Sequence, residues 1–402
     1  MLTDDKHNIT KTLAFLFIPF LFLSLLTVTS LPNELREIGR LSSNLILYIG
    51  VFILICHFII NRNNFNTDIN KLLSVYISFI LLGIVYIISH FYNKNFYEDT
   101  TLLTLFLTFL LIVTFMNVKW TRNHIIIIGI LCNFIILFLI LHWYVLDFPT
   151  NRFKSIWRNP NGLGIVTLIM LFFQIISIRF LNNIGKIIFL GFILLNLIIM
   201  YSTTSRTVWI SLIVILISFV VYKHFNRVFS YLFIITLPAT FLFVFLYIKL
   251  QDTTVGNKLN DLSLEIFSKN FFSGRSELWY EIWNGTLSSL WLGHGVGTRP
   301  RDIADVTLTA HNQYLQIIID TGLIGLAAFS ILLFFIWKIL LSKLTENPIA
   351  KWSACFFIGI LVYQSLEVSL FLNNPSYSHF QWLIISIGIG FVDKTSNFVK
   401  TN

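Results

Sequence analysis

Three residues of this sequence combine a side chain that can move a proton with two that can hold an anion. His311 opens the segment "HNQYLQIIIDTGLIGL", Arg206 stands in "YSTTSRTVWISL", and Arg275 follows a glycine in "GRSELW". An imidazole can accept a proton from a hydroxyl near neutral pH. Two guanidiniums can bind and stabilise a departing pyrophosphate, because their planar forks match its oxygens. Together these groups suit transfer of a group from a pyrophosphate donor to a hydroxyl acceptor.

The elements that position these residues must lie in a membrane. Of the 402 residues 56% are hydrophobic and 12% are charged, whereas soluble domains carry about 25% charged residues. Apolar runs such as "LLSVYISFILLGIVYIISHFY" recur near the ~20 residues that cross a hydrocarbon core. They do not alternate as the strands of a membrane barrel do. We predict an all-α polytopic membrane protein, because in lipid a helix satisfies its own backbone groups.

The apolar runs predict twelve spans within a single integral membrane domain, residues 1–402. Most connections are short, but the stretch 250–317 before the tenth span is long enough to form a large loop outside the membrane. The predicted spans are 12–30, 44–61, 72–92, 99–116, 124–143, 162–179, 187–202, 207–222, 229–249, 318–341, 352–371 and 379–392.

The distribution of lysine and arginine predicts the face of the membrane on which each connection lies. With the N-terminus inside, the inner segments hold 15 of the 28 basic residues and the short outer loops hold seven, as expected if cytoplasmic loops collect positive charge. Both termini are then cytoplasmic, with Lys6 and Lys11 near one end and Lys394 and Lys400 near the other. The net charge of +9 is mainly an orientation signal, and nucleic acid is not an expected partner.

In this topology His311, Arg206 and the long loop all face outward. Short outer loops are normally poor in positive charge, so Arg206 needs a reason to be there. Two interpretations stay open: the guanidinium reaches lipid headgroups, or it binds an anionic ligand. His311 is likewise either a satisfied polar residue at the mouth of a helix or a group that takes part in chemistry.

The long loop is predicted to contain an amphipathic helix. Apolar residues recur at near-helical spacing from Leu278 to Trp291, and Ser273 is the expected N-cap. Arg275 then stands at the helix start, where N–H groups favour anions. The tryptophans are expected to pack at headgroup depth. The "GHGVG" that follows lacks the strand and lysine of a phosphate loop, and we interpret His294 within it as a structural residue.

The remaining titratable residues give weaker signals. Asp320 and Glu367 are isolated carboxylates near apolar spans, and Glu367, inside a predicted span, is a functional candidate by default. No role follows from its position alone. Cys56, Cys132 and Cys355 fall in apolar runs without metal or disulfide spacing, so they are expected to be packed thiols.

Four motifs, taken in order, resemble the O-antigen ligase and polymerase superfamily of the bacterial envelope. They are "WRNPNGLGIVTL", "SRTVW", "GRSELW" followed by "GHGVG", and "HNQYLQIIIDTGLIGL". By motif the resemblance covers residues 157–326, and by span count and the large outer loop it covers the whole chain.

This resemblance implies a GT-C-type fold and an inverting glycosyltransferase that needs no metal or cofactor. It implies an enzyme of the bacterial inner membrane, embedded among membrane lipids, that takes glycan from undecaprenyl pyrophosphate on the periplasmic side. Arg206 and Arg275 would bind the donor pyrophosphate, and His311 would activate the acceptor hydroxyl or stabilise the transition state. Further candidates for the donor or acceptor pocket are Arg158, Asn161 and Asn312.

Three functions remain open at this stage. The leading one is an O-antigen ligase, which joins polysaccharide to a lipid A–core acceptor. A repeat-unit polymerase would use the same donor with a second lipid-linked glycan as acceptor. A polysaccharide transporter or flippase is compatible with twelve spans, but the sequence lacks paired Gly- or Pro-broken spans in matching halves.

Overall fold

The structure is a computed structural model that describes residues 12–60, 65–93, 99–267 and 270–392. Its regular elements, within these ranges, are α-helices and short 3₁₀-helices, as the all-α prediction requires. The terminal lysines used to predict orientation, Lys6, Lys11, Lys394 and Lys400, lie outside the described residues.

Each predicted span overlaps a helix of the structure. The helices are α2 (Phe17–Ser24), α3 (Asn33–Ile60), α4 (Phe65–Tyr92), α5 (Asp99–Asn117), α6 (Arg122–Val145), α7 (Pro160–Ile178), α8 (Asn183–Ser202), α9 (Arg206–His224), α10 (Asn226–Leu250), α11 (Thr254–Phe267), α12 (Arg275–Thr286), α13 (Gln313–Ser342), α14 (Ala350–Gln364) and α15 (Pro375–Gly390), with short 3₁₀-helices η1 (Leu25–Val28), η3 (Leu287–Ser289) and η4 (Pro300–Asp302).

Eight of the described helices are long and apolar enough to cross a membrane: α3, α4, α6, α7, α8, α9, α10 and α13. The other predicted spans coincide with shorter helices, such as α14 with 15 residues and α15 with 16. A polytopic membrane protein is therefore supported, and the full set of twelve crossings stays a prediction.

One predicted boundary is wrong by a wide margin. The second span was expected to begin at residue 44, but α3 begins at Asn33. Its first turns carry Glu34, where an acidic side chain suits the positive end of the helix dipole, and an exposed i,i+3 pair of Glu37 and Arg40. Polar residues thus extend the helix beyond its apolar run.

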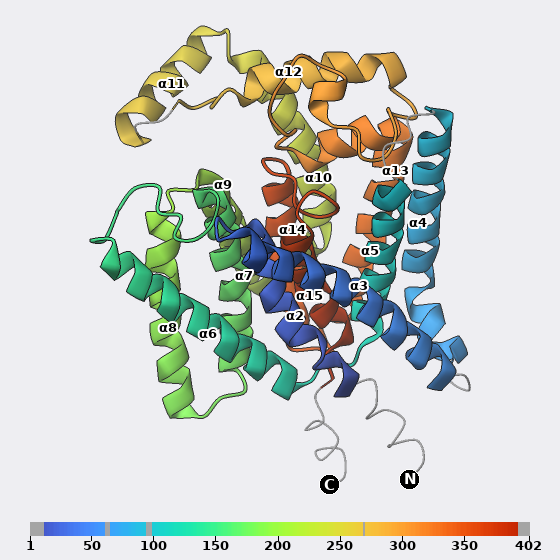
Figure 1. Cartoon of the computed structure of the whole chain (residues 1–402), viewed down its shortest axis with the longest axis vertical. Helices are drawn as coiled ribbons and strands as arrows, with labels where there is room; N and C mark the ends of the chain where they lie inside the picture. The colour runs from blue at the N-terminus through green and yellow to red at the C-terminus, as the bar shows by residue number, and fades with distance from the viewer. Residues whose placement is uncertain (1–11, 61–64, 94–98, 268–269, 393–402) are drawn as a thin grey trace.

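Loops that were predicted on the same side of the membrane contact each other. On the predicted outer side, Thr29 forms an antiparallel bridge with Trp157. On the predicted inner side, Trp120 forms a parallel bridge with Phe391, and Arg122 donates to the carbonyl of Phe180 at 2.6 Å. Helices α11 and α12 lie at one end of the molecule, and the loop between α7 and α8 lies at the other (Figure 1).

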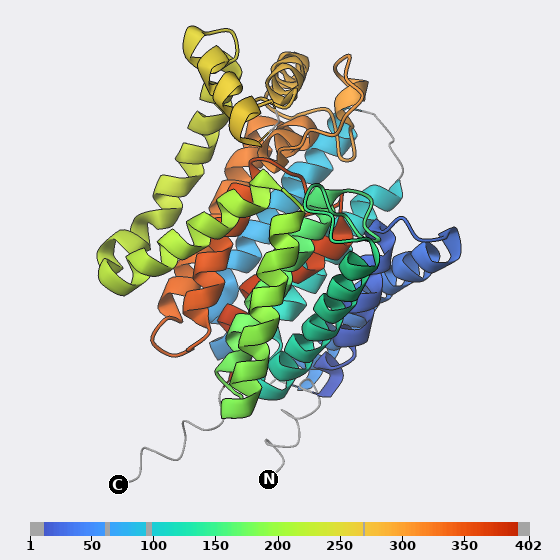
Figure 2. The same ribbon diagram turned by 90° about the vertical axis from the view of Figure 1, so that its left-hand side faces the viewer.

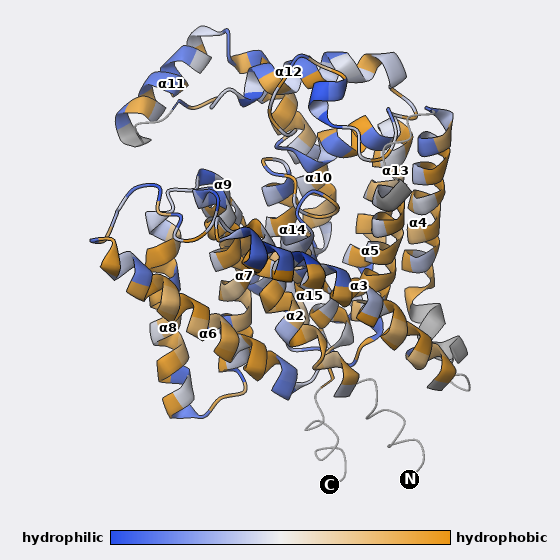
Figure 3. Ribbon diagram, viewed as in Figure 1, coloured by the Kyte–Doolittle hydropathy of each residue, from blue (hydrophilic) through white to orange (hydrophobic). Residues whose placement is uncertain are grey.

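The core is formed by helices that are apolar on all sides. In the most apolar 18-residue stretch of α7, 83% of the residues are buried, whereas in that of α8 22% are buried. Such all-round apolar helices belong in the interior of a bundle, and here aromatic rings pack between them, as Phe172 of α7 does on Phe356 of α14 at 5.0 Å. The outward faces of α8 and α10 carry exposed apolar side chains and suit contact with lipid. Figure 2 shows both helices at the outside of the bundle, and Figure 3 shows the hydrophobic residues along α8.

Helix α13 is interrupted at Gly322, where φ is +66° and ψ is −165°. The "GHGVG" turn and the residues just before it pack into this break: the backbone N–H of His294 donates to the carbonyl of Ile319 at 2.7 Å, and that of Leu323 donates to the carbonyl of Leu290 at 2.9 Å. The turn thus satisfies backbone groups that the break exposes. It also ties the predicted outer loop to the part of α13 that follows His311.

We expect Gly322→Ala to lower the unfolding temperature of the purified protein. This backbone conformation is essentially restricted to glycine and costs other residues about 1–3 kcal/mol, and an added Cβ would lie 2.3 Å from the carbonyl carbon of Trp291. Gly191→Ala is the matched control, because its Cβ would meet nothing within 4 Å. Equal unfolding temperatures for the two variants in detergent would contradict this account of the break.

Candidate active site

The imidazole and the two guanidiniums that the sequence predicts as a site line one cavity. Arg206, Arg275 and His311 surround a space of about 580 Å³, and Asn161 lines the same space. Each belongs to the start of a helix: Arg206 begins α9, Arg275 begins α12, Asn161 lies in the first turn of α7, and His311 precedes α13. Helix N-termini present N–H groups and positive dipole ends. This first cavity is therefore built to receive an anion.

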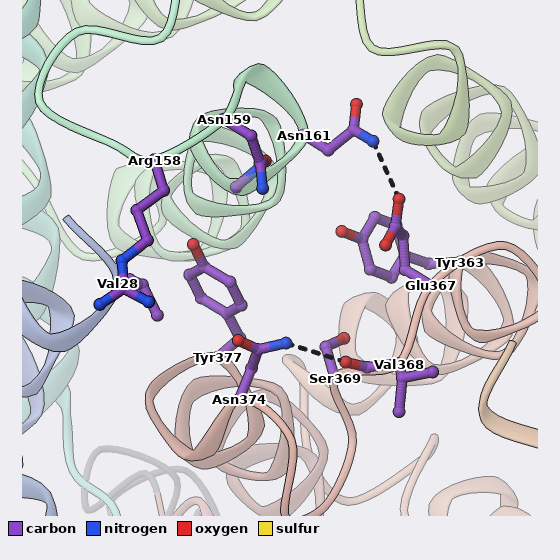
Figure 4. A pocket seen from close by; sticks show the side chains of 11 residues that line it. Val28, Arg158, Asn159, Asn161, Tyr363, Glu367, Val368, Ser369, Asn374 and Tyr377 are labelled. Carbon is purple, nitrogen blue, oxygen red and sulfur yellow. Dashed lines mark hydrogen bonds between the residues drawn. The ribbon is translucent and has the colours of Figure 1, made fainter. Parts of the chain in front are cut away.

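Glu367 contacts three polar side chains that line this cavity. Its Oε1 accepts hydrogen bonds from Asn161 Nδ2 and Arg275 Nη2, each at 2.9 Å, and its Oε2 lies 3.0 Å from His311 Nδ1. Figure 4 shows the Asn161 side chain directed at this carboxylate. Glu367 lies beyond the end of α14 at Gln364, so the predicted span 352–371 is too long and Glu367 is a loop residue.

The carboxylate of Glu367 fixes the role of each nitrogen of His311. Paired with the permanently charged guanidinium of Arg275, it is ionised and can only accept hydrogen bonds. Nδ1 of His311 must then carry the hydrogen that bridges to Oε2. In a neutral ring this leaves the lone pair on Nε2, which can accept a proton from a hydroxyl.

Four residues that line the cavity have a positive φ without being glycine: Arg152, at +54°, and three residues at or near the proposed site residues. His311 has a φ of +44°, Ser273 a φ of +54° and Thr204 a φ of +51°. Non-glycine residues rarely adopt this left-handed conformation, and such strain concentrates at functional sites. His311 is itself a proposed site residue, and Ser273 and Thr204 lie two positions before Arg275 and Arg206.

Arg206 connects α9 to the segment that covers the first cavity. Its guanidinium donates to Ser263 Oγ of α11 at 3.3 Å and to the carbonyl of Asn270 at 3.1 Å, and it also contacts the hydroxyl of Ser273. The predicted N-cap role of Ser273 is wrong, because Gly274 occupies that position with a φ of +70°. Ser273 instead serves as a partner of Arg206.

Arg158 and Asn312, two further candidates for the donor or acceptor pocket, do not line the first cavity. Arg158 is absent from the lining of the first cavity. It donates to the carbonyls of Thr29 and Thr27, each at 3.2 Å, and borders a smaller cavity of about 100 Å³ that Figure 4 shows with Asn161, Tyr377 and Glu367. Asn312 is fully buried and caps α13: its Oδ1 accepts from the N–H of Leu315 at 3.0 Å. Its place in the structure is that of a helix cap.

A second large cavity, of about 620 Å³, meets the first at His311. Glu367 and Arg158 line it, together with Arg299 and Arg301 of the predicted outer loop. His294 lines neither of the two large cavities, and burial lowers its pKa below the ordinary value of 6.5. His311 thus stands where two substrates could meet, a feature that sequence spacing does not reveal.

Comparison with known proteins bears on the chemistry of this cavity. Residues 189–330 match the model of a protein family described as O-antigen ligase. The matched segment contains Arg206, Arg275 and His311. This match supports membership of the O-antigen ligase and polymerase superfamily. No curated protein matches the chain. At the level of the superfamily, the match supports an enzyme of glycan transfer that works on lipid-linked substrates in a membrane.

We expect Arg275→Lys to lower the rate of glycan transfer about tenfold or more, because the ammonium group of lysine lacks the planar fork of a guanidinium. Nη2 of Arg275 donates to Glu367, so the remaining N–H groups of this guanidinium can face an anion in the first cavity. Lysine can serve one partner or the other. Transfer is measured with the purified protein and a lipid-linked donor.

Arg40→Lys serves as the control, because Arg40 is exposed and its partner is the neighbouring Glu37. It should transfer glycan at the rate of the unaltered protein. Full activity of Arg275→Lys would make Arg275 a structural residue.

Proposed function

We propose that this protein is an O-antigen ligase, which transfers polysaccharide from undecaprenyl pyrophosphate to a hydroxyl of a lipid A–core acceptor. The observation that carries the proposal is the convergence of His311, Arg206 and Arg275 on one cavity, with Glu367 holding the imidazole. The matched family, whose segment contains these three residues, supports glycan transfer of the ligase or polymerase type.

The proposed reaction is a direct displacement at the anomeric carbon of the donor sugar. The acceptor oxygen forms a bond to this carbon, and the bond from the carbon to the pyrophosphate oxygen breaks. The proton of the acceptor hydroxyl passes to Nε2 of His311. Arg206 and Arg275 stabilise the negative charge that develops on the pyrophosphate. One displacement inverts the configuration at the anomeric carbon, and cleavage of the pyrophosphate linkage drives the transfer without a metal or cofactor.

The two large cavities suit two substrates. The first, with Arg206 and Arg275, is the proposed donor cavity, and the second, with Arg299 and Arg301, is the proposed acceptor cavity. In the predicted topology both open to the periplasmic face of the inner membrane. A cysteine introduced at the exposed Leu308, which lines both cavities, should then react with a membrane-impermeant thiol reagent in intact spheroplasts.

A repeat-unit polymerase remains the second candidate, and one observation favours it. The second cavity also carries guanidiniums, so it could receive the pyrophosphate of a second lipid-linked glycan. A transporter would need the ionisable groups near the middle of the membrane, whereas here they gather where α7, α9, α12 and α13 begin.

Deletion of the gene distinguishes these functions. Loss of a ligase should leave long polymer on the carrier lipid and lipopolysaccharide without O-antigen. Loss of a polymerase should leave lipopolysaccharide that carries single repeat units. A deletion strain with glycan of normal length and abundance on its lipopolysaccharide would overturn both proposals.

A further inference from the structure

The second cavity has charges of both signs, and they are arranged in two zones. Arg299 and Arg301 are exposed residues of the outer loop at η4. Asp320, in contrast, is 5% exposed and lies in α13 beside the break at Gly322. All three border the same space. The cavity therefore has a cationic rim and a floor with a carboxylate.

The rim arginines differ from the other charged residues of the cavity in their pairing. Arg158 is held by backbone carbonyls, and Glu367 is held by Arg275 and His311. Among the described residues, neither Arg299 nor Arg301 forms an ion pair. The acidic neighbours in the same loop, Asp302 and Asp305, do not border the cavity. The loop thus presents its cationic side chains to this space.

The floor is suited to uncharged hydroxyl groups. Gln316 Nε2 donates to Asp320 Oδ1 at 3.0 Å and to the carbonyl of Thr298 at 2.9 Å, which fixes the position of the carboxylate. A buried carboxyl group held in this way exchanges hydrogen bonds with sugar hydroxyls, and it offers no positive charge to an anion. An anionic group of the ligand must therefore lie at the rim.

We propose that the acceptor is a phosphorylated glycan whose phosphate is bound by Arg299 and Arg301 while its sugar hydroxyls contact Asp320 and reach His311. The inference rests on the proposed transfer function and specifies the class of its acceptor. Guanidinium forks bind phosphate through charge-assisted hydrogen bonds. Two acceptors share this chemistry: a lipid A–core with phosphorylated core sugars, and a second glycan linked to a lipid pyrophosphate.

The test measures acceptor binding to the full chain in nanodiscs, in the absence of donor. Each acceptor is supplied in two forms: lipid A–core before and after phosphatase treatment, and a single repeat unit on lipid pyrophosphate or lipid monophosphate. The variant is Arg299→Gln with Arg301→Gln. The control, Arg36→Gln with Arg40→Gln in α3, removes the same charge from the same predicted face, and neither residue borders the second cavity.

We expect the variant to bind one acceptor in its fully phosphorylated form about tenfold or more weakly, and the control to bind it like the unaltered protein. Removal of phosphate should abolish the difference, and the acceptor that shows it identifies the source of the phosphate. Equal binding by variant and unaltered protein, or equal affinity for both forms of each acceptor, overturns the inference. If phosphate dependence is found but no glycan is transferred when donor is added, the inference stands and the proposed function fails.

Discussion

His311→Ala should abolish glycan transfer while leaving the protein inserted and folded. A positioned general base contributes about 10²–10⁴ to the rate, and Nε2 of His311 is the proposed proton acceptor, with its lone pair set by the contact of Nδ1 with Glu367. The side chain of His311 is 30% exposed and lines the cavities, so its removal leaves no void in the packed core. The rate is measured with lipid-linked donor and acceptor in reconstituted membranes.

The matched control for this variant is His294→Ala. His294 lies in the same predicted outer loop and is also partly buried, but it borders neither large cavity. We expect this variant to retain transfer activity, and both variants to unfold near the temperature of the unaltered protein. Normal transfer by His311→Ala, or equal losses in both variants, would remove His311 from the proposed chemistry.

The sequence predicted the elements that hold the site better than the contacts within it. Long apolar runs specify helices in lipid, and Arg275 does begin a helix, as the near-helical spacing from Leu278 to Trp291 predicted, although the cap is Gly274 and not Ser273. The break in α13 was not predicted, because the apolar pattern continues through Gly322 and the turn that stabilises the break, Gly293–Gly297, is distant in sequence.

Glu367 shows why the remaining features could not be derived from spacing. Its position near an apolar span marked it as a candidate, but its partners His311 and Asn161 are 56 and 206 residues away in the chain. Local periodicity carries no information on such pairs, which depend on how α7 and α14 pack in the bundle. The same holds for the second cavity, whose walls come from α4, α5, α13 and three loops.

Glu367→Gln is expected to reduce the rate of transfer about a hundredfold or more, although it changes no side-chain volume. A glutamine amide can turn its NH₂ group toward Nδ1 of His311. The hydrogen of the neutral imidazole would then reside on Nε2, which could no longer accept a proton from the acceptor hydroxyl. Glu277→Gln is the matched control, because Glu277 lies on α12 two residues from Arg275 and contacts Gln251 at the surface. It should retain activity.

The steady-state constants of Glu367→Gln separate two explanations of its effect. If Glu367 acts as a positioning residue for His311, kcat falls and the KM for the donor is unchanged, because the interaction that is lost belongs to the transition state. If Glu367 mainly holds Arg275 at 2.9 Å for the donor, the KM for the donor rises instead. We expect the first pattern, with partial recovery in Glu367→Asp, since a shorter carboxylate still forces the hydrogen onto Nδ1. A Glu367→Asp variant as slow as Glu367→Gln would show that the distance to His311, rather than the tautomer, limits the reaction.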